Sequence, residues 1–118
     1  MKYLCLIYHD EATLKELTEC EDEALAAETY TFRDEMRESG HFLSANALES
    51  IETAASLRSR GSSFLVTDGP YVETKEQLGG YILIEARDLN EAIRVASRFP
   101  PARLGGIEVR PVRDTGME

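Results

Sequence analysis

The densest group of side chains able to transfer protons or bind charged groups lies at residues 68 to 80, a polar stretch between two apolar runs. It opens with Asp68, in an Asp-Gly-Pro sequence, and continues with Tyr71, Glu73 and Lys75. A carboxylate that is partly buried at the mouth of a cleft can act as a general acid or base. The sequence therefore makes Asp68 a candidate catalytic residue, and Tyr71, Glu73 and Lys75 candidates for binding a small-molecule substrate.

These residues also have structural explanations. Asp-Gly-Pro is a turn sequence, because aspartate can bond to the downstream backbone, glycine accepts a positive φ and proline fixes the next φ. Tyr71 can serve to anchor the loop to the core. Residues 73 to 76 can form a solvated charge run, or begin a short helical turn whose free amides receive an anion. The sequence alone leaves both explanations open.

Three further candidates lie outside this stretch. His9 follows the first apolar run and is the second candidate catalytic residue, with Asp68 as its potential partner. Asn46, in an apolar segment, needs a hydrogen-bond partner if buried and is a candidate for lining a pocket. Arg110 can bind a carboxylate with two hydrogen bonds, although a salt bridge with one of the many acids is the simpler explanation. A catalytic role requires that His9, Asp68, Tyr71 and Arg110 converge on one cavity.

Apolar periodicity predicts the elements that must position these side chains. One helix is expected from about 19 to 39, begun by a capping box of Thr18 and Glu21, and a second from Asp88 to Phe99, ended by two prolines. Strands are expected at 2–8, 41–48, 80–86 and 107–112, with a hairpin formed by 54–60 and 62–67.

Without the hairpin, the order is β-α-β-β-α-β, which predicts an α+β fold of the ferredoxin-like type, with both helices on one face of an antiparallel sheet. The first strand and residues 81 to 84 are apolar on both alternating faces. We therefore expect the face without helices to meet a second copy of the chain in a symmetric homodimer.

Composition limits the classes of function. At 118 residues the chain is expected to form one domain, 1–118. Its net charge is −9, and residues 10 to 38 hold 11 acidic and 3 basic residues. No basic stripe is present, so nucleic acid and an anionic membrane surface are disfavoured as partners.

The chain turns acidic by Asp10, which leaves no room for a signal peptide, so a cytoplasmic location is expected. Cys5 and Cys20 are then expected to be free thiols. The two cysteines and two histidines do not form a metal-ligand motif, and the glycine pairs at 79–80 and 105–106 do not match a phosphate-binding fingerprint. We therefore expect neither a metal nor a cofactor.

Residues 68 to 80, DGPYVETKEQLGG, resemble the signature of the YCII-related proteins of the DGPF type, with Tyr71 where the family's name has Phe. Segments 1–8, 43–48 and 105–112 are similar to that family in the same order. The resemblance implies a ferredoxin-like α+β domain that dimerises into an α/β barrel, in a family whose own activity is largely unassigned. Other members of the wider group are thought to use a His–Asp pair with the His at the start of the first helix. Residues 18 to 23 of this chain contain no histidine, so that pair does not carry over.

Two functions remain open from the sequence. One is an enzyme or binder that acts by acid–base chemistry on a small organic molecule, in a pocket between the sheet, the loop at residues 68 to 80 and a dimer partner. The other is a non-catalytic regulatory or protein-interaction module, whose acidic helix contacts a basic partner.

Overall fold

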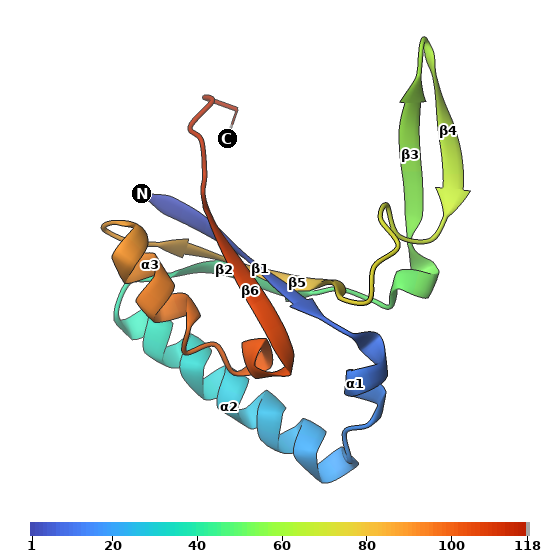
Figure 1. Ribbon diagram of the computed structural model, residues 1–118. Helices are drawn as coiled ribbons and strands as arrows, with labels where there is room; N and C mark the ends of the chain where they lie inside the picture. The colour runs from blue at the N-terminus through green and yellow to red at the C-terminus, as the bar shows by residue number, and fades with distance from the viewer. Residues whose placement is uncertain (118) are drawn as a thin grey trace.

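A four-stranded antiparallel sheet, with helices on one face, forms the body of the protein in the computed structural model, which describes residues 1–117 (Figure 1). The strands are β1 (Lys2–His9), β2 (Phe42–Ala47), β5 (Gln77–Glu85) and β6 (Gly105–Pro111), in the order β2-β5-β1-β6. β1 and β2 are both antiparallel to β5 and therefore parallel to each other. This order confirms the predicted ferredoxin-like arrangement.

Two main helices cover the sheet, α2 (Glu19–Glu38) and α3 (Leu89–Ala96). The predicted capping box begins α2: the Thr18 hydroxyl accepts from the Glu21 amide, and the Glu21 carboxylate accepts from the Thr18 amide. Asp88 accepts from the Glu91 amide at the start of α3. The short helix α1 (Glu11–Lys15) and the 3-10 helices η1 (Ile51–Thr53) and η2 (Pro100–Leu104) were not predicted. Across residues 1–117, none of the helices combines the length and apolarity needed to cross a membrane.

The core lies between the sheet and the helices. Alternate residues of β1 and β5 point into it and meet apolar side chains of α2 and α3: Tyr3, Cys5, Ile7, Ile82, Ile84, Phe32, Met36, Ala92, Val95 and Ala96. Burial of an isoleucine of this kind contributes about 1.5–3 kcal/mol. Burial also raises the pKa of the Cys5 thiol to about 11, so the thiol stays protonated. Cys5 and Cys20 are both free, as predicted.

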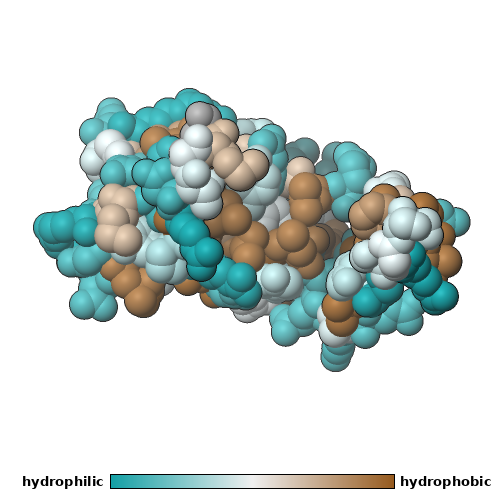
Figure 2. Space-filling model, turned by 90° about the horizontal axis from the view of Figure 1, so that it is seen from above, coloured by the Kyte–Doolittle hydropathy of each residue, from teal (hydrophilic) through white to brown (hydrophobic). Residues whose placement is uncertain are grey.

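The opposite face of the sheet carries no helix. Strand register places Leu6, Tyr81 and Asn46 side by side on this open face, with Leu4 and Leu83 next along the strands. The leucines of β1 and β5 are half-buried there rather than covered. In the view from above, hydrophobic residues gather in the middle of the surface and on the projecting hairpin (Figure 2).

The predicted hairpin is confirmed as β3 (Ala55–Arg60) and β4 (Ser63–Asp68), with Gly61 at a positive φ in its turn. It projects away from the sheet instead of packing on it (Figure 1). One of its faces is apolar, because Leu57 pairs with Val66 and Phe64 lies two residues from Val66. Leu57 is 53% exposed, Val66 is 62% exposed and Phe64 is 63% exposed.

The loop between the hairpin and β5 differs from the prediction in two ways. β5 begins at Gln77, earlier than the predicted strand at 80–86, because residues 77 and 78 pair with β1 beyond an irregularity at Ile7 and Tyr8. No helical turn forms at 73–76, where the chain only bends. The Gln77 side chain donates to the carbonyl groups of Val72 and Thr74 and so holds the bend.

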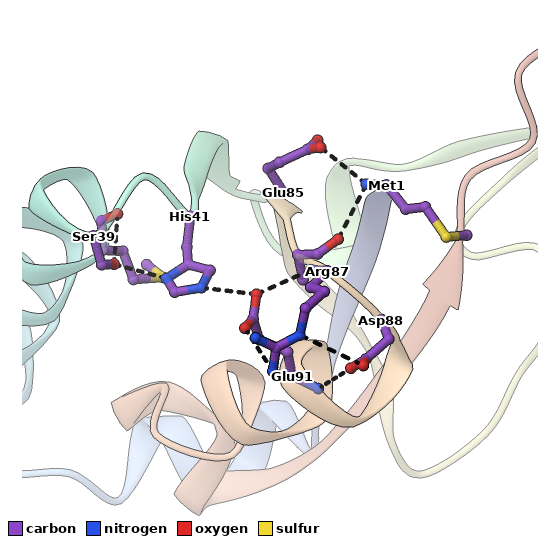
Figure 3. A network of polar contacts seen from close by, with 9 residues as sticks. Met1, Ser39, His41, Glu85, Arg87, Asp88 and Glu91 are labelled. Atoms are coloured by element: carbon purple, nitrogen blue, oxygen red, sulfur yellow. Dashed lines mark hydrogen bonds and ion pairs between the residues drawn. The ribbon is translucent and has the colours of Figure 1, made fainter.

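A polar network locks the end of the sheet that lies away from His9 (Figure 3). His41 contacts the Ser39 hydroxyl at 2.7 Å and the Glu91 carboxylate at 3.3 Å. Glu91 also accepts from the Arg87 amide and pairs with the Arg87 guanidinium. The hydrogen bond from the Arg87 backbone amide is the main reason that the pKa of Glu91 is lowered. The network ties the start of β2 to the start of α3.

Candidate functional site

A cavity of about 550 Å³ lies between α2 and the sheet. It is termed the helix-side cavity, and its size is within the range of sites for small molecules. Its walls come from the end of β1, from β2, from the first half of β5, from α1, from one side of α2 and from the segment around η2: Ile7, His9, Leu14, Asp22, Leu25, Ala26, Thr29, Tyr30, Arg33, Met36, Arg37, Phe42, Ala45, Asn46, Ala47, Gly79, Gly80, Tyr81, Phe99, Pro101 and Leu104.

His9 lines this cavity from the last position of β1. Side chains alternate along a strand, so His9 points to the same face as the buried Ile7. Its Nδ1 atom is buried and, within residues 1–117, has no hydrogen-bond partner. A buried polar atom without a partner costs free energy and calls for an explanation.

Gly79 makes room for the imidazole ring. A Cβ atom at this position would lie 2.0 Å from Nε2 of His9 and 2.2 Å from its Cε1. The ring therefore rests directly on the glycine backbone, and any side chain at position 79 would displace it. Glycine at this position thus allows the His9 ring to approach the backbone of β5 closely.

Arg33 is the second polar group of the cavity, and the sequence prediction missed it. It comes from α2, and its Nε atom is buried with no partner in the described chain. The guanidinium carbon lies 5.0 Å from the centre of the Tyr30 ring. A signal existed in the sequence, because Arg33 follows Thr29 by four residues and precedes Met36 by three, so it lies on the stripe that faces the sheet.

Glu11 fixes the segment beside His9. Its carboxylate accepts from the Ile51 amide at 2.7 Å and from the Ser50 hydroxyl at 2.9 Å. The hydrogen bond from the Ile51 amide is the main reason that the pKa of Glu11 is lowered, and the hydrogen bond from the Ser50 hydroxyl lowers it further. The ionised Glu11 thus ties α1 to η1, just before the hairpin.

A second cavity, of about 860 Å³, lies where α1, the loop before β5 and the start of β6 meet. It is termed the loop-side cavity and is lined by Tyr8, Asp10, Thr13, Thr74, Lys75, Glu76, Leu104, Gly106, Ile107 and Glu108. Three carboxylates and one lysine line it, and its buried polar atoms are not left without partners in residues 1–117. Although it is larger, we place the candidate site in the helix-side cavity, where the unpartnered atoms are.

The other predicted site residues are dispersed. Asp68 is exposed at the end of β4 and lines neither cavity, and no side chain or amide of residues 1–117 bonds to its carboxylate. Glu73 is exposed in the loop. Tyr71 anchors the loop to the hairpin: Arg58 donates to its hydroxyl at 3.3 Å and lies 4.1 Å from its ring centre.

Asn46 and Arg110 lie on the open face by strand register. The Asn46 amide donates to the Tyr81 hydroxyl at 2.9 Å, and both residues also border the helix-side cavity. Arg110 forms an ion pair with Glu108, and this bond is the main reason that the pKa of Arg110 is raised.

The predicted site residues therefore do not share one cavity. His9 and Asn46 border the helix-side cavity, Lys75 borders the loop-side cavity, and Asp68, Tyr71, Glu73 and Arg110 border neither. His9, Asp68, Tyr71 and Arg110 do not converge within one chain. Among residues 1–117, no group of three His, Cys, Asp or Glu side chains is arranged so that it could hold a metal ion.

Comparisons with known proteins show the family. The family model described as YCII-related domain matches residues 1–115. A similar sequence is the uncharacterized protein R00369 of Rhizobium meliloti (strain 1021), which is 34% identical over 114 residues. The alignment covers 95% of this chain and 92% of that protein.

Proposed function

Because the chain belongs to the YCII-related family, in which the matched relative is uncharacterised, we propose a function from its own side chains: it binds a small organic molecule in the helix-side cavity, and His9 transfers a proton to or from that molecule.

The unpartnered Nδ1 of His9 carries this proposal. An imidazole can accept and return a proton near neutral pH, which suits it to general acid–base catalysis. The ring borders a cavity of small-molecule size and is seated on Gly79. A ligand that bonds to Nδ1 would remove the cost of leaving this atom unpaired.

The reaction class is proton transfer at a carbon next to a carbonyl group. The imidazole takes a proton from that carbon while the electron pair moves to the carbonyl oxygen, which gives an enolate. Return of the proton to the same carbon exchanges it with solvent, and return elsewhere isomerises the substrate. No further reactant is needed for either outcome.

Deuterium exchange tests the proposal. Phenylpyruvate carries an acidic carbon between its ring and its carbonyl group, and exchange of this position in deuterated water can be followed by proton NMR. We expect the wild-type protein to accelerate the exchange and His9→Gln to lose at least about tenfold of the acceleration, since a positioned base contributes about 10²–10⁴-fold.

Two variants serve as controls. His41→Gln removes the other histidine, which contacts Ser39 and Glu91 and lines neither cavity. Asp68→Asn tests the second predicted catalytic residue, which lies on the hairpin. We expect both to exchange phenylpyruvate at the wild-type rate. Equal rates for wild type and His9→Gln would remove His9 from the chemistry and leave a non-catalytic role.

We also propose that the open face pairs with a second copy of the chain. The half-buried leucines of β1 and β5 on that face support this, since a second copy would cover them. A cytoplasmic location is part of the same proposal and is supported by the two free thiols, which a reducing compartment preserves.

A further inference from the structure

The charge of Arg33 is poorly compensated within its own chain. Its closest carboxylate is that of the adjacent Asp34, at 3.5 Å, which is at the limit of a hydrogen bond. Other arginines that meet the same helix have close partners: Arg98 lies 2.8 Å from Glu35, and Arg103 lies 2.5 Å from Glu28. Within residues 1–117 the ion pair of Arg33 is this long one with Asp34, and it leaves the Nε atom without a partner.

The unpartnered atom of Arg33 is its Nε. Nε and one terminal nitrogen form an edge of the guanidinium group that binds both oxygens of a carboxylate through two parallel hydrogen bonds. A group that needs two donors in one plane is therefore the natural partner of this edge. Arg33 borders the helix-side cavity and its side chain is 36% exposed, so a rotation of this side chain would turn the edge toward a ligand in the cavity.

The rest of the cavity is mainly apolar. Leu14, Leu25, Met36, Phe42 and Phe99 line it, and Arg37 is stacked on Phe42 with 4.9 Å between the guanidinium carbon and the ring centre. Asp22 is the one carboxylate in the lining of this cavity within residues 1–117, and it would repel a second negative group on a ligand. The walls therefore suit an apolar body with a single acidic group.

We infer that the ligand is a small organic acid with one carboxylate and an apolar body, whose carboxylate binds the Nε edge of Arg33. This inference rests on the proposed function, because it names the class of molecule that occupies the same cavity. The carboxylate at Arg33 holds the apolar body against α2 and places the ligand beside His9, which lines the same cavity.

Calorimetric titration with three probes of nearly the same shape tests the inference. Phenylacetate is anionic, phenylacetamide is neutral and phenethylamine is cationic. We expect phenylacetate to bind at least about tenfold more tightly than phenylacetamide, since hydrogen bonds to a charged acceptor are stronger than those to a neutral one. Phenethylamine is expected to bind most weakly, because Arg33 repels it.

Two arginine variants separate the carboxylate site from general packing. Arg33→Met keeps an unbranched apolar side chain and is expected to lose the preference for phenylacetate over phenylacetamide. Arg98→Met is the matched control, because Arg98 is also stacked on an aromatic ring, 5.3 Å from the centre of Phe32, but lies outside the cavity. We expect it to keep the preference. Circular dichroism of each variant confirms that it is folded.

The outcomes distinguish this inference from the proposed function. If phenylacetate and phenylacetamide bind equally and Arg33→Met changes neither, the carboxylate inference is wrong while the cavity remains a binding site. If none of the probes binds the wild-type protein, the inference and the proposed binding function are both overturned.

Discussion

Single residues decide what the helix-side cavity can do. His9 is at the end of a strand and Arg33 is on a helix, and the two line one cavity only because α2 packs on the sheet. Gly79 has an equally specific role, since its missing side chain provides the space for the imidazole. The position of the His9 ring thus depends on the absence of a side chain at residue 79.

Gly79→Ala tests that role without removing a functional group. The added methyl group would clash with the end of the His9 ring, which can rotate away, so the fold should survive. We expect the variant to keep nearly the wild-type melting temperature but to lose at least about tenfold of the phenylpyruvate exchange, because displaced catalytic groups lose efficiency steeply. If a folded Gly79→Ala protein exchanged phenylpyruvate at the wild-type rate, the contact of the His9 ring with Gly79 would not matter for the reaction.

At this scale the sequence predicts part of the site. His9 and Asn46 are identifiable from their positions in apolar runs, whereas Arg33 looks like one more charge on an acidic helix. Asp68 looks catalytic because its sequence neighbours are charged, yet the hairpin carries it away from both cavities. Which side chains share a cavity depends on packing between distant segments, and local sequence does not encode that packing directly.

The secondary-structure elements were more predictable, because their signals are local. The capping box of Thr18 and Glu21, the cap at Asp88 and the alternation of the four sheet strands all lie where the sequence indicates. The start of β5 was predicted late, since residues 77 to 79 were read as part of the loop, whereas pairing of Gln77 and Leu78 with β1 makes this segment strand. The direction in which the hairpin projects was not predictable either, because it depends on packing between distant segments and not on local sequence.

At Gly105 the backbones of β6 and β1 approach each other closely. A Cβ atom there would lie 2.0 Å from the carbonyl oxygen of Tyr8, which is fixed in β1, whereas at Gly106 it would meet no heavy atom of residues 1–117 within 4 Å. We expect Gly105→Ala to destabilise the protein by about 1–3 kcal/mol and Gly106→Ala by less than about 1 kcal/mol. Urea unfolding measures both, and equal effects would contradict the close approach of β1 and β6.

The network at Glu91 predicts a dependence of stability on pH. The pKa of Glu91 is lowered from 4.5 in the folded protein, mainly by the bond from the Arg87 amide. A carboxylate whose pKa is lower in the folded than in the unfolded protein stabilises the fold at pH values above its unfolded-state pKa. This stabilisation is lost as the pH falls through the folded-state pKa. Wild type should therefore exceed Glu91→Gln in melting temperature at neutral pH, with the difference shrinking below about pH 4.5. A difference that is constant with pH would argue against this network.

The whole molecule is flat and extended. Its dimensions are 47 × 43 × 19 Å and its radius of gyration is 16.1 Å, against roughly 13.5 Å for a compact chain of this length. The projecting hairpin and the uncovered sheet face explain the difference (Figures 1 and 2). A second copy of the chain would give both surfaces something to pack against.

Light scattering tests the proposed pairing. We expect a particle mass of twice the 13.2 kDa of the chain, and a shift toward the monomer for Leu6→Lys, since a charge on the open face opposes burial there. Leu89→Lys provides the control, because Leu89 is an exposed leucine on α3. A monomeric wild-type protein would contradict the proposal.

The central claim is that an organic acid binds beside His9, and histidine NMR tests it most directly. The chain has two histidines, His9 in the helix-side cavity and His41 in the network at the other end of the sheet. With nitrogen-15 in both imidazole rings, titration with phenylacetate should shift the ring signals of His9 and leave those of His41 in place. If the His9 signals stay unchanged at saturating phenylacetate, or if both histidines shift equally, the helix-side cavity is not the binding site.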